Sequence, residues 1–118
     1  MAARFVIKNS SDGQFMFVLK AGNNEVILTS ELYTQKQGAE NGIASVRANA
    51  PDDARFDRRT SKAGQPYFVL KAANGEIIGT SEMYSSTSSM KKGIASVKKN
   101  SQFTPIDDQT ESKVAAKA

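Results

Sequence analysis

The chain has 118 residues, of which 39% are hydrophobic and 24% are charged, and its formal net charge is +4. This composition is typical of one globular domain and excludes an intrinsically disordered chain. Cysteine and histidine are both absent, which excludes disulfides, thiolate metal sites and the side chain best suited to proton transfer near neutral pH.

The amino-terminal residues do not resemble a targeting segment. Arg4 and Lys8 enclose only three apolar residues, far fewer than the hydrophobic region of a signal peptide requires. No run in the chain approaches the roughly eighteen apolar residues of a membrane-spanning helix. We therefore expect a cytoplasmic bacterial protein with no membrane partner.

The chain is a tandem duplication in which residues 4–50 align with residues 55–101 without a gap. Twenty-three of the 47 aligned pairs are identical, far more than chance gives, so this is a true internal repeat. The clearest shared blocks are FVLKA, TSE-x-Y and GIASV, which begin at Phe17, Thr29 and Gly42 in the first repeat and at Phe68, Thr80 and Gly93 in the second.

Each repeat begins with three predicted strands. Residues 4–9 alternate in polarity, residues 14–21 are rich in aromatic and β-branched residues, and residues 25–30 follow a second turn. Asp12-Gly13 is a hairpin turn signal between the first two strands. The second repeat has the corresponding turn at Ala63-Gly64 and its third strand at 76–81.

The hydrophobic period then changes from two residues to 3.6, which predicts one helix in each repeat. Small or apolar residues follow the spacing i, i+3, i+4 and i+7. These residues are Ala39, Gly42, Ile43 and Val46 in the first repeat and Met90, Gly93, Ile94 and Val97 in the second. Thr34 is the predicted cap of the first helix, and the helices should end near Asn49 and Asn100. The repeated glycines should let each helix lie close to the sheet.

After the second helix, residues 103–107 predict a last short strand, which Pro105 confines to a sheet edge. Residues 109–118 are polar and alanine-rich without periodicity, so we expect a disordered tail. The domain then comprises residues 1–108, with both repeats in it.

The combined pattern of FVLKA, a turn, E-x-I, TSE-x-Y and GIASV resembles the YegP-like family of bacterial proteins, in its duplicated branch. The resemblance covers both repeats up to about residue 107. It implies an α+β fold in which two β-β-β-α-β units form one antiparallel sheet with both helices on one face and pseudo-twofold symmetry. It also implies that the C-terminal strands are exchanged, so that 103–107 lies beside the first strand while 55–60 serves both units. The family has no established activity or functional residues to carry over.

Catalytic chemistry is not apparent in the sequence. No carboxylate cluster has the spacing of metal ligands, and no glycine-rich loop matches a phosphate site, so we expect no enzyme, no metal and no cofactor. The one repeated carboxylate–aromatic pattern is Glu31-x-Tyr33 and Glu82-x-Tyr84. Its structural interpretation, a tyrosine packed over a helix start, is favoured over a catalytic Glu–Tyr pair.

One face of the sheet offers a candidate binding surface. The repeated residues Phe5, Phe17, Leu19, Phe56, Phe68 and Leu70 share parity and should form the helix-covered core. Residues of the other parity then form an open face that is mostly basic. Its candidate binding residues are Arg4, Lys8, Lys20, Arg55, Arg59, Tyr67 and Lys71.

Two interpretations compete for that face. Long Lys and Arg stems cover apolar sheet residues and keep them soluble, which is the common arrangement. Alternatively, the face binds single-stranded nucleic acid or another polyanion, although it offers one aromatic side chain where stacking platforms usually have two or three. Function therefore stays open between a non-enzymatic binding module, a polyanion-binding domain and a self-associating structural module. Because the duplication already pairs two units, we expect a monomer.

Overall fold

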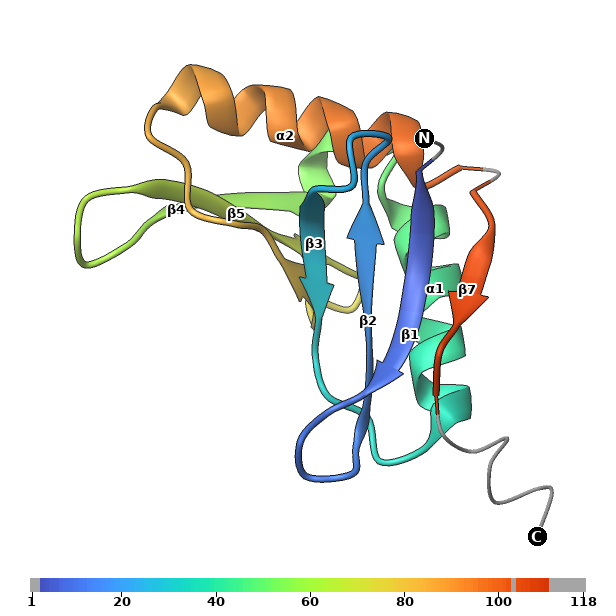
Figure 1. Cartoon of the computed structure of the whole chain (residues 1–118). Helices are drawn as coiled ribbons and strands as arrows, with labels where there is room; N and C mark the ends of the chain where they lie inside the picture. The colour runs from blue at the N-terminus through green and yellow to red at the C-terminus, as the bar shows by residue number, and fades with distance from the viewer. Residues whose placement is uncertain (1–2, 103, 111–118) are drawn as a thin grey trace, which may run out of the picture.

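The computed structural model describes residues 3–102 and 104–110. The first repeat forms β1 (Arg4–Asn9), β2 (Phe15–Lys20), β3 (Val26–Ser30) and α1 (Lys36–Asn49). A short 3-10 turn, η1 (Asp53–Arg55), leads into the second repeat, which forms β4 (Phe56–Thr60), β5 (Pro66–Lys71), β6 (Ile77–Thr80) and α2 (Thr87–Asn100). The last strand is β7 (Ile106–Asp108). The predicted α+β fold of two duplicated units is confirmed (Figure 1).

All seven strands belong to one sheet in the order β4-β5-β6-β3-β2-β1-β7. The repeats meet where Thr29 of β3 pairs with its own counterpart, Thr80 of β6. The pseudo-twofold axis therefore passes between these two central strands. Because β7 comes from the second repeat and pairs with β1 of the first, the predicted position of the last strand is confirmed. The prediction that residues 55–60 serve both units was wrong, because β4 is an edge strand that pairs with β5 of its own repeat and, among the described residues, with no strand of the first.

The sheet differs from the predicted antiparallel one at a single pair, since β7 runs parallel to β1. The chain leaves α2 and enters the sheet edge in the same direction as β1. The amide of Phe5 donates to the carbonyl of Pro105 at 3.0 Å, and the amide of Gln109 donates to that of Ile7 at 2.8 Å. A strand of three residues carries no sequence signal for its direction, so the prediction of antiparallel pairing was wrong there.

The C-terminal boundaries also differ from the prediction. The last strand is Ile106–Asp108, and the predicted tail begins too early at residue 109. The Gln109 amide is held by β1, and Thr110 is only 1% exposed, with its hydroxyl donating to Asp108 at 2.7 Å. The remaining predicted tail, residues 111–118, and Phe103 lie outside the described residues.

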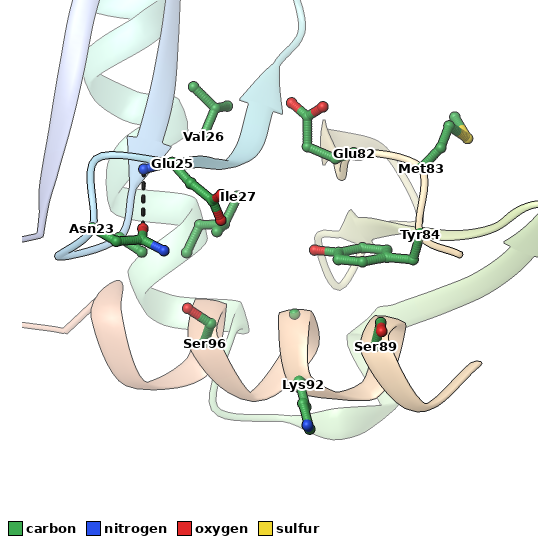
Figure 2. Close-up of a pocket in the computed structure, with 12 residues that line it drawn as sticks. Asn23, Glu25, Val26, Ile27, Glu82, Met83, Tyr84, Ser89, Lys92 and Ser96 are labelled. Carbon is green, nitrogen blue, oxygen red and sulfur yellow. Dashed lines mark hydrogen bonds between the residues drawn. The ribbon is translucent and has the colours of Figure 1, made fainter. Parts of the chain in front are cut away.

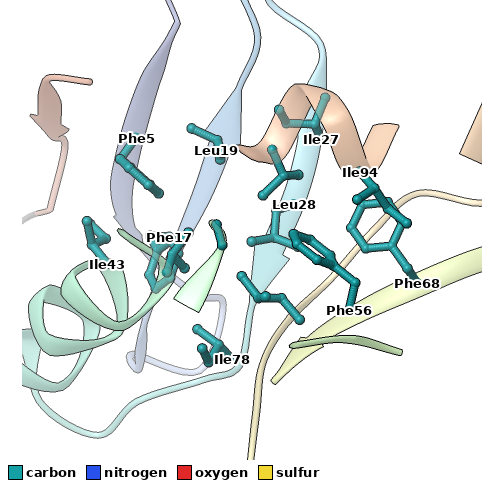
Figure 3. Close-up of a cluster of buried hydrophobic side chains, with 14 of the residues drawn as sticks. Phe5, Phe17, Leu19, Ile27, Leu28, Ile43, Phe56, Phe68, Ile78 and Ile94 are labelled. Carbon is teal, nitrogen blue, oxygen red and sulfur yellow. The ribbon is translucent and has the colours of Figure 1, made fainter. Parts of the chain in front are cut away.

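Both helices pack on one face of the sheet and enclose a single core (Figure 3). The predicted core residues Phe5, Phe17 and Leu19, and their counterparts in the second repeat, are all less than 5% exposed. Phe5 packs edge-to-face on Phe17 at 5.8 Å between ring centroids, and Phe56 packs on Phe68 in the same way at 5.5 Å. The buried residues of α1 and α2 are the two predicted stripes, which confirms the helical interpretation.

The start of α1 corrects a smaller prediction. Its N-cap is Gln35, without a side-chain hydrogen bond, and not Thr34. Tyr33 and Phe15 exchange two backbone hydrogen bonds of 2.7 Å, which keep the chain extended up to Tyr33 and delay the helix. In α2 the side chain of Ser86 does cap the helix by accepting from the Ser89 amide at 3.1 Å. Neither helix is long and apolar enough to cross a membrane in the described part of the chain.

Candidate functional site

Two pockets lie where one repeat meets the other. The Tyr84 pocket, of about 630 Å³, lies between the β2–β3 hairpin of the first repeat and the start of α2 in the second. Its lining residues are Ala21, Asn23, Glu25, Val26, Ile27, Glu82, Met83, Tyr84, Ser89, Lys92, Gly93 and Ser96. Neither repeat could form this pocket alone.

The Tyr33 pocket, of about 500 Å³, is the pseudo-symmetric counterpart. It uses the β5–β6 hairpin of the second repeat and the start of α1 in the first. Its lining residues are Glu31, Tyr33, Gly38, Asn41, Gly42, Ser45, Ala72, Asn74, Glu76, Ile77 and Ile78. Each of these positions aligns with a lining position of the Tyr84 pocket, so the duplication produced two versions of one site.

The pockets are better preserved between the repeats than the rest of the chain. Eight of the eleven shared lining positions hold the same residue, against fifteen of the other 36 aligned positions. The differences include Gly38 against Ser89 and Asn41 against Lys92. Because core packing accounts for identical buried residues, the informative identities are the exposed ones, Asn23 with Asn74, Glu25 with Glu76 and Glu31 with Glu82. The two asparagines have a structural role, since each side-chain oxygen accepts from the amide of the hairpin glutamate, which leaves the glutamates.

A tyrosine forms the inner wall of each pocket, over a glycine of the helix. A Cβ atom at Gly93 would lie 2.1 Å from the hydroxyl oxygen of Tyr84, and one at Gly42 would lie 2.5 Å from that of Tyr33. The ring of Tyr33 stacks on Phe17 at 6.5 Å, and that of Tyr84 stacks on Phe68 at 6.2 Å. The glycines therefore make room for the tyrosine side chain, which refines the predicted close approach of helix and sheet.

A buried serine fixes the segment that carries the glutamate and tyrosine. The Ser30 hydroxyl accepts from the Phe17 amide at 2.8 Å and donates to the Glu31 carbonyl at 2.7 Å. Ser81 makes the same two bonds, to Phe68 at 3.0 Å and to Glu82 at 2.8 Å. The repeated TSE-x-Y block thus orients Glu31 and Glu82 at the pocket rims and directs the tyrosines inward, as its structural interpretation predicts.

The pocket carboxylates are not used in the ion pairs of the fold. The ion pairs between described residues all take their carboxylate from an aspartate: Asp52, Asp53, Asp57, Asp107 or Asp108. Burial raises the pKa of Tyr84, and the negative charges of Glu82 and Glu25 raise it further. Burial, Glu31 and Glu76 raise the pKa of Tyr33 in the same way. Carboxylates from both repeats therefore raise the pKa of each tyrosine hydroxyl.

Figure 2 shows how these groups lie around the Tyr84 pocket, where the Glu82 carboxylate at the rim points away from the Tyr84 hydroxyl. The Glu25 carboxylate and the Tyr84 hydroxyl point into the same space from opposite sides. Asn23 supports the hairpin because its side-chain oxygen accepts from the Glu25 amide at 3.1 Å. Lys92, although it lines the pocket, points away from this space (Figure 2). The hairpin glutamates Glu25 and Glu76 were not among the sequence candidates, since only the tertiary fold brings them to the other repeat's tyrosine.

The structure divides the predicted basic face into two groups. Arg4 lies opposite Lys20 in the β1–β2 pair, with Lys8 further along β1. Arg59 lies opposite Tyr67 in the β4–β5 pair, and Lys71 ends β5. The strands β3 and β6 separate the groups by about 14 Å, because neighbouring strands are about 4.8 Å apart. Arg55 joins neither, since it lies in η1 and its Nε donates to Asn49 of α1 at 3.2 Å.

Most cations of that face already have carboxylate partners. Arg59 and Lys71 share Asp57, at 3.0 and 3.3 Å. Arg4 lies 4.0 Å from Asp107, and Arg55 lies 3.7 Å from Asp52. Lys8 and Lys20 are the two without such a partner among the described residues. Val6, Val18 and Val69 also point to this face by register, yet each is at most 3% exposed, so neighbouring side chains cover them.

Comparison with known proteins identifies relatives over nearly the whole chain. The family model "Domain of unknown function (DUF1508)" matches residues 10–57 and 61–108, two segments offset by the 51 residues of the repeat. A UPF0339 protein of Bordetella pertussis is 57% identical over 111 residues, covering 94% of this chain and 99% of the relative. The UPF0339 protein YegP of Escherichia coli K12 is 56% identical over 110 residues, covering 93% and 100%.

Two solved structures have the same fold. The solution structure of the Escherichia coli protein of unknown function yegP has a TM-score of 0.88 at 55% identity, over 93% of this chain and 95% of that chain. A UPF0339 protein of Shewanella oneidensis has a TM-score of 0.87 at 56% identity, over 93% of each chain. None of these relatives has an assigned function.

Proposed function

The chain belongs to the DUF1508 family, which has no assigned function, and we propose that it is a non-enzymatic module that binds small ligands in the Tyr33 and Tyr84 pockets. The observation that carries this proposal is the preservation of the pocket lining between the repeats, including four exposed glutamates. Exposed side chains contribute little to folding, so their identity in both repeats favours a role in recognition. Pockets of this volume are within the range of small-molecule sites.

The tyrosines support binding rather than catalysis. Their pKa values are raised by burial and by neighbouring carboxylates, so both phenols stay protonated well above neutral pH and are poor general bases. A phenol that keeps its proton is still a hydrogen-bond donor and acceptor. The same arrangement therefore suits recognition of a polar group that enters from the pocket mouth.

A small-molecule screen tests this proposal. The amide NMR spectrum of the ¹⁵N-labelled chain would be recorded with mixtures of neutral, acidic and basic fragments. Shifts should concentrate at residues 21–27 and 82–96 and at the equivalent residues 31–45 and 72–78. The Tyr33→Phe and Tyr84→Phe variants should weaken binding, whereas Tyr67→Phe, on the open sheet face, should not. A screen in which no fragment shifts these residues would contradict the proposal.

Binding of a polyanion to the open sheet face has weaker support. Lys8 and Lys20 are available for phosphate contacts, but Asp57 and Asp107 oppose the approach of an anion near Arg59, Lys71 and Arg4. Replacing Lys20 and Lys71 with glutamate tests this alternative. Unchanged binding of RNA or single-stranded DNA by that variant would remove the face from consideration.

The proposal also assigns the module to the bacterial cytoplasm as a monomer. Cell fractionation tests the compartment. Sedimentation at several protein concentrations tests the oligomeric state, and a mass that rises with concentration would instead favour the self-associating module.

A further inference from the structure

We propose that each pocket recognises an alkylammonium group, the cation of a primary amine on an apolar stem; this inference rests on the proposed function. Each pocket has two glutamates, one from each repeat, and these glutamates have no ion-pair partner among the described residues. In the Tyr84 pocket they are Glu25 and Glu82, and in the Tyr33 pocket Glu76 and Glu31. A cavity with this charge disfavours anions and attracts a cation from solution.

The Tyr84 pocket has the acceptors that an ammonium group needs. An ammonium carries three N–H donors and no acceptor. The Glu25 carboxylate and the Tyr84 hydroxyl face each other across the pocket (Figure 2), and Ser96 lines it from α2. These three oxygens come from the β2–β3 hairpin, the segment between β6 and α2, and α2 itself, so they border the pocket from three parts of the chain. The Ser96 hydroxyl already accepts from the Asn100 side chain at 2.9 Å, so Glu25 and Tyr84 are the main acceptors for an ammonium group.

The apolar part of the lining selects an amine with a hydrocarbon stem. Val26 and Ile27 line the Tyr84 pocket, and their counterparts Ile77 and Ile78 line the Tyr33 pocket. Apolar lining of this kind contacts the hydrocarbon part of a ligand. Met83 also lines the Tyr84 pocket, but its side chain points away from the space between Glu25 and Tyr84 (Figure 2). A metal ion fits less well, since no group of three or more carboxylate, histidine or cysteine ligands occurs among the described residues.

The one charged difference between the pockets predicts that they differ in affinity. Lys92 lines the Tyr84 pocket where Asn41 lines the Tyr33 pocket. Although Lys92 points outward, its positive charge opposes a bound cation through solvent. We therefore expect the Tyr33 pocket to bind an ammonium about two-fold more tightly, because a solvent-exposed charge at that range is largely screened.

The test compares two probes of the same shape, n-butylammonium and n-butanol, by amide NMR titration of the full chain. Butylammonium should give saturable shifts in both pockets and bind at least about five-fold more tightly than butanol, the difference expected from an exposed carboxylate pair. Glu25→Gln should lower the affinity of the Tyr84 pocket for butylammonium several-fold and leave that of the Tyr33 pocket unchanged. Glu76→Gln should lower the affinity of the Tyr33 pocket and leave that of the Tyr84 pocket unchanged. Lys92→Asn should make the affinities of the two pockets equal.

The matched control is Glu40→Gln, an exposed glutamate of α1 outside both pockets. It removes the same charge and should leave both affinities unchanged. A free amine and a lysine side chain present the same group, so Nα-acetyl-lysine methylamide forms a second arm. Tighter binding of this compound than of butylammonium would assign the pockets to lysine side chains, and weaker binding would assign them to free amines.

Two results would overturn the inference and leave the proposed function standing. Equal affinities for butanol and butylammonium would show that the pockets do not distinguish a cationic ligand from a neutral one. Fragments that bind the pockets when butylammonium does not would show a different ligand class. If no compound shifts the pocket residues, the proposed function itself fails.

Discussion

The hydroxyl of Tyr84 lies so close to Gly93 that a Cβ atom there would be only 2.1 Å from the phenol oxygen. The equivalent contact of Gly42 involves Tyr33 and also Phe17, whose ring carbon would lie 2.8 Å away. Phe17 is fully buried, whereas the half-buried Tyr84 borders open space. Both glycines therefore make room for a tyrosine, but the side chains around Gly93 have more space to move than those around Gly42.

Alanine at these glycines should have unequal effects. Gly42→Ala should lower the free energy of unfolding by about 1–3 kcal/mol, because the buried Phe17 ring cannot move away. Gly93→Ala should change it by less than about 1 kcal/mol, because Tyr84 can shift into the pocket and alanine favours the helix by up to 1 kcal/mol. Urea denaturation measures both. Stabilisation by Gly42→Ala would contradict the described packing.

The serines of the repeated TSE-x-Y block should be sensitive to substitution. Ser30→Ala leaves the Phe17 amide without its 2.8 Å acceptor, and Ser81→Ala does the same at Phe68. Each variant should lose about 1–3 kcal/mol of unfolding free energy, the cost of an unsatisfied buried amide. Ser11→Ala, an exposed serine in the β1–β2 turn, is the control and should be nearly neutral. Neutral Ser30→Ala would mean that water or another group satisfies the amide.

Substitutions at Gly79 and Leu28 should have non-additive effects on the free energy of unfolding. They are equivalent positions of the two repeats, and they meet beside the pseudo-twofold axis. A Cβ at Gly79 would lie 2.9 Å from the Cγ of Leu28 and 3.0 Å from the Thr29 carbonyl. Gly79→Ala should cost about 1–3 kcal/mol. In the double variant with Leu28→Ala, the loss should be smaller than the sum of the single losses, because alanine at 28 removes part of the clash. Strict additivity would contradict this account.

Asp108 should contribute to the acid dependence of stability. Its partial burial opposes ionisation, but the Lys36 ammonium and the Thr110 hydroxyl and amide outweigh it and lower its pKa from 3.8 to about 2. Since the pKa is lower in the folded chain, the stabilisation is complete above the unfolded value and is lost as the pH falls through about 2. The Asp108 side chain is 38% exposed, so screening limits the contribution to about 1 kcal/mol.

Asp108→Asn should therefore reduce stability at neutral pH and flatten its fall between about pH 5 and pH 2. Lys36→Met should have the same effect, because it removes the cation that attaches β7 to the start of α1. Urea denaturation across this pH range measures both. An unchanged acid dependence in both variants would show that the Lys36–Asp108 pair does not stabilise the folded chain.

The strands and helices could be predicted because their periodicity is local. The stripe of Ile43 and Val46 and the alternation around Phe17 each specify one buried face, and the repeat gave two independent readings of both. Strand direction at β7 and the cap of α1 could not be predicted. Both depend on backbone partners that are distant in the sequence: Ile7 binds Gln109, which follows β7, and Phe15 binds Tyr33, which lies three residues before α1.

Only part of the candidate site could be predicted from the sequence. Glu31, Glu82 and their tyrosines form a visible repeated pattern, but Glu25 and Glu76 appear as ordinary turn residues. Only the pairing of β3 with β6 brings each hairpin to the other repeat. The basic face was predicted from strand parity, which places side chains on a face but does not report Asp57 and Asp107 as partners of the cations.

The most direct test of the twin-pocket account is the number of binding sites per chain. Ser45→Phe should fill the Tyr33 pocket and Ser96→Phe the Tyr84 pocket, with folding checked by the amide spectrum. The stoichiometry of the strongest ligand from the fragment screen would be measured in the unmodified chain, in each variant and in the double variant. We expect two binding sites in the unmodified chain, one in each single variant and none in the double variant. Binding that persists in the folded double variant would place the site elsewhere and contradict it.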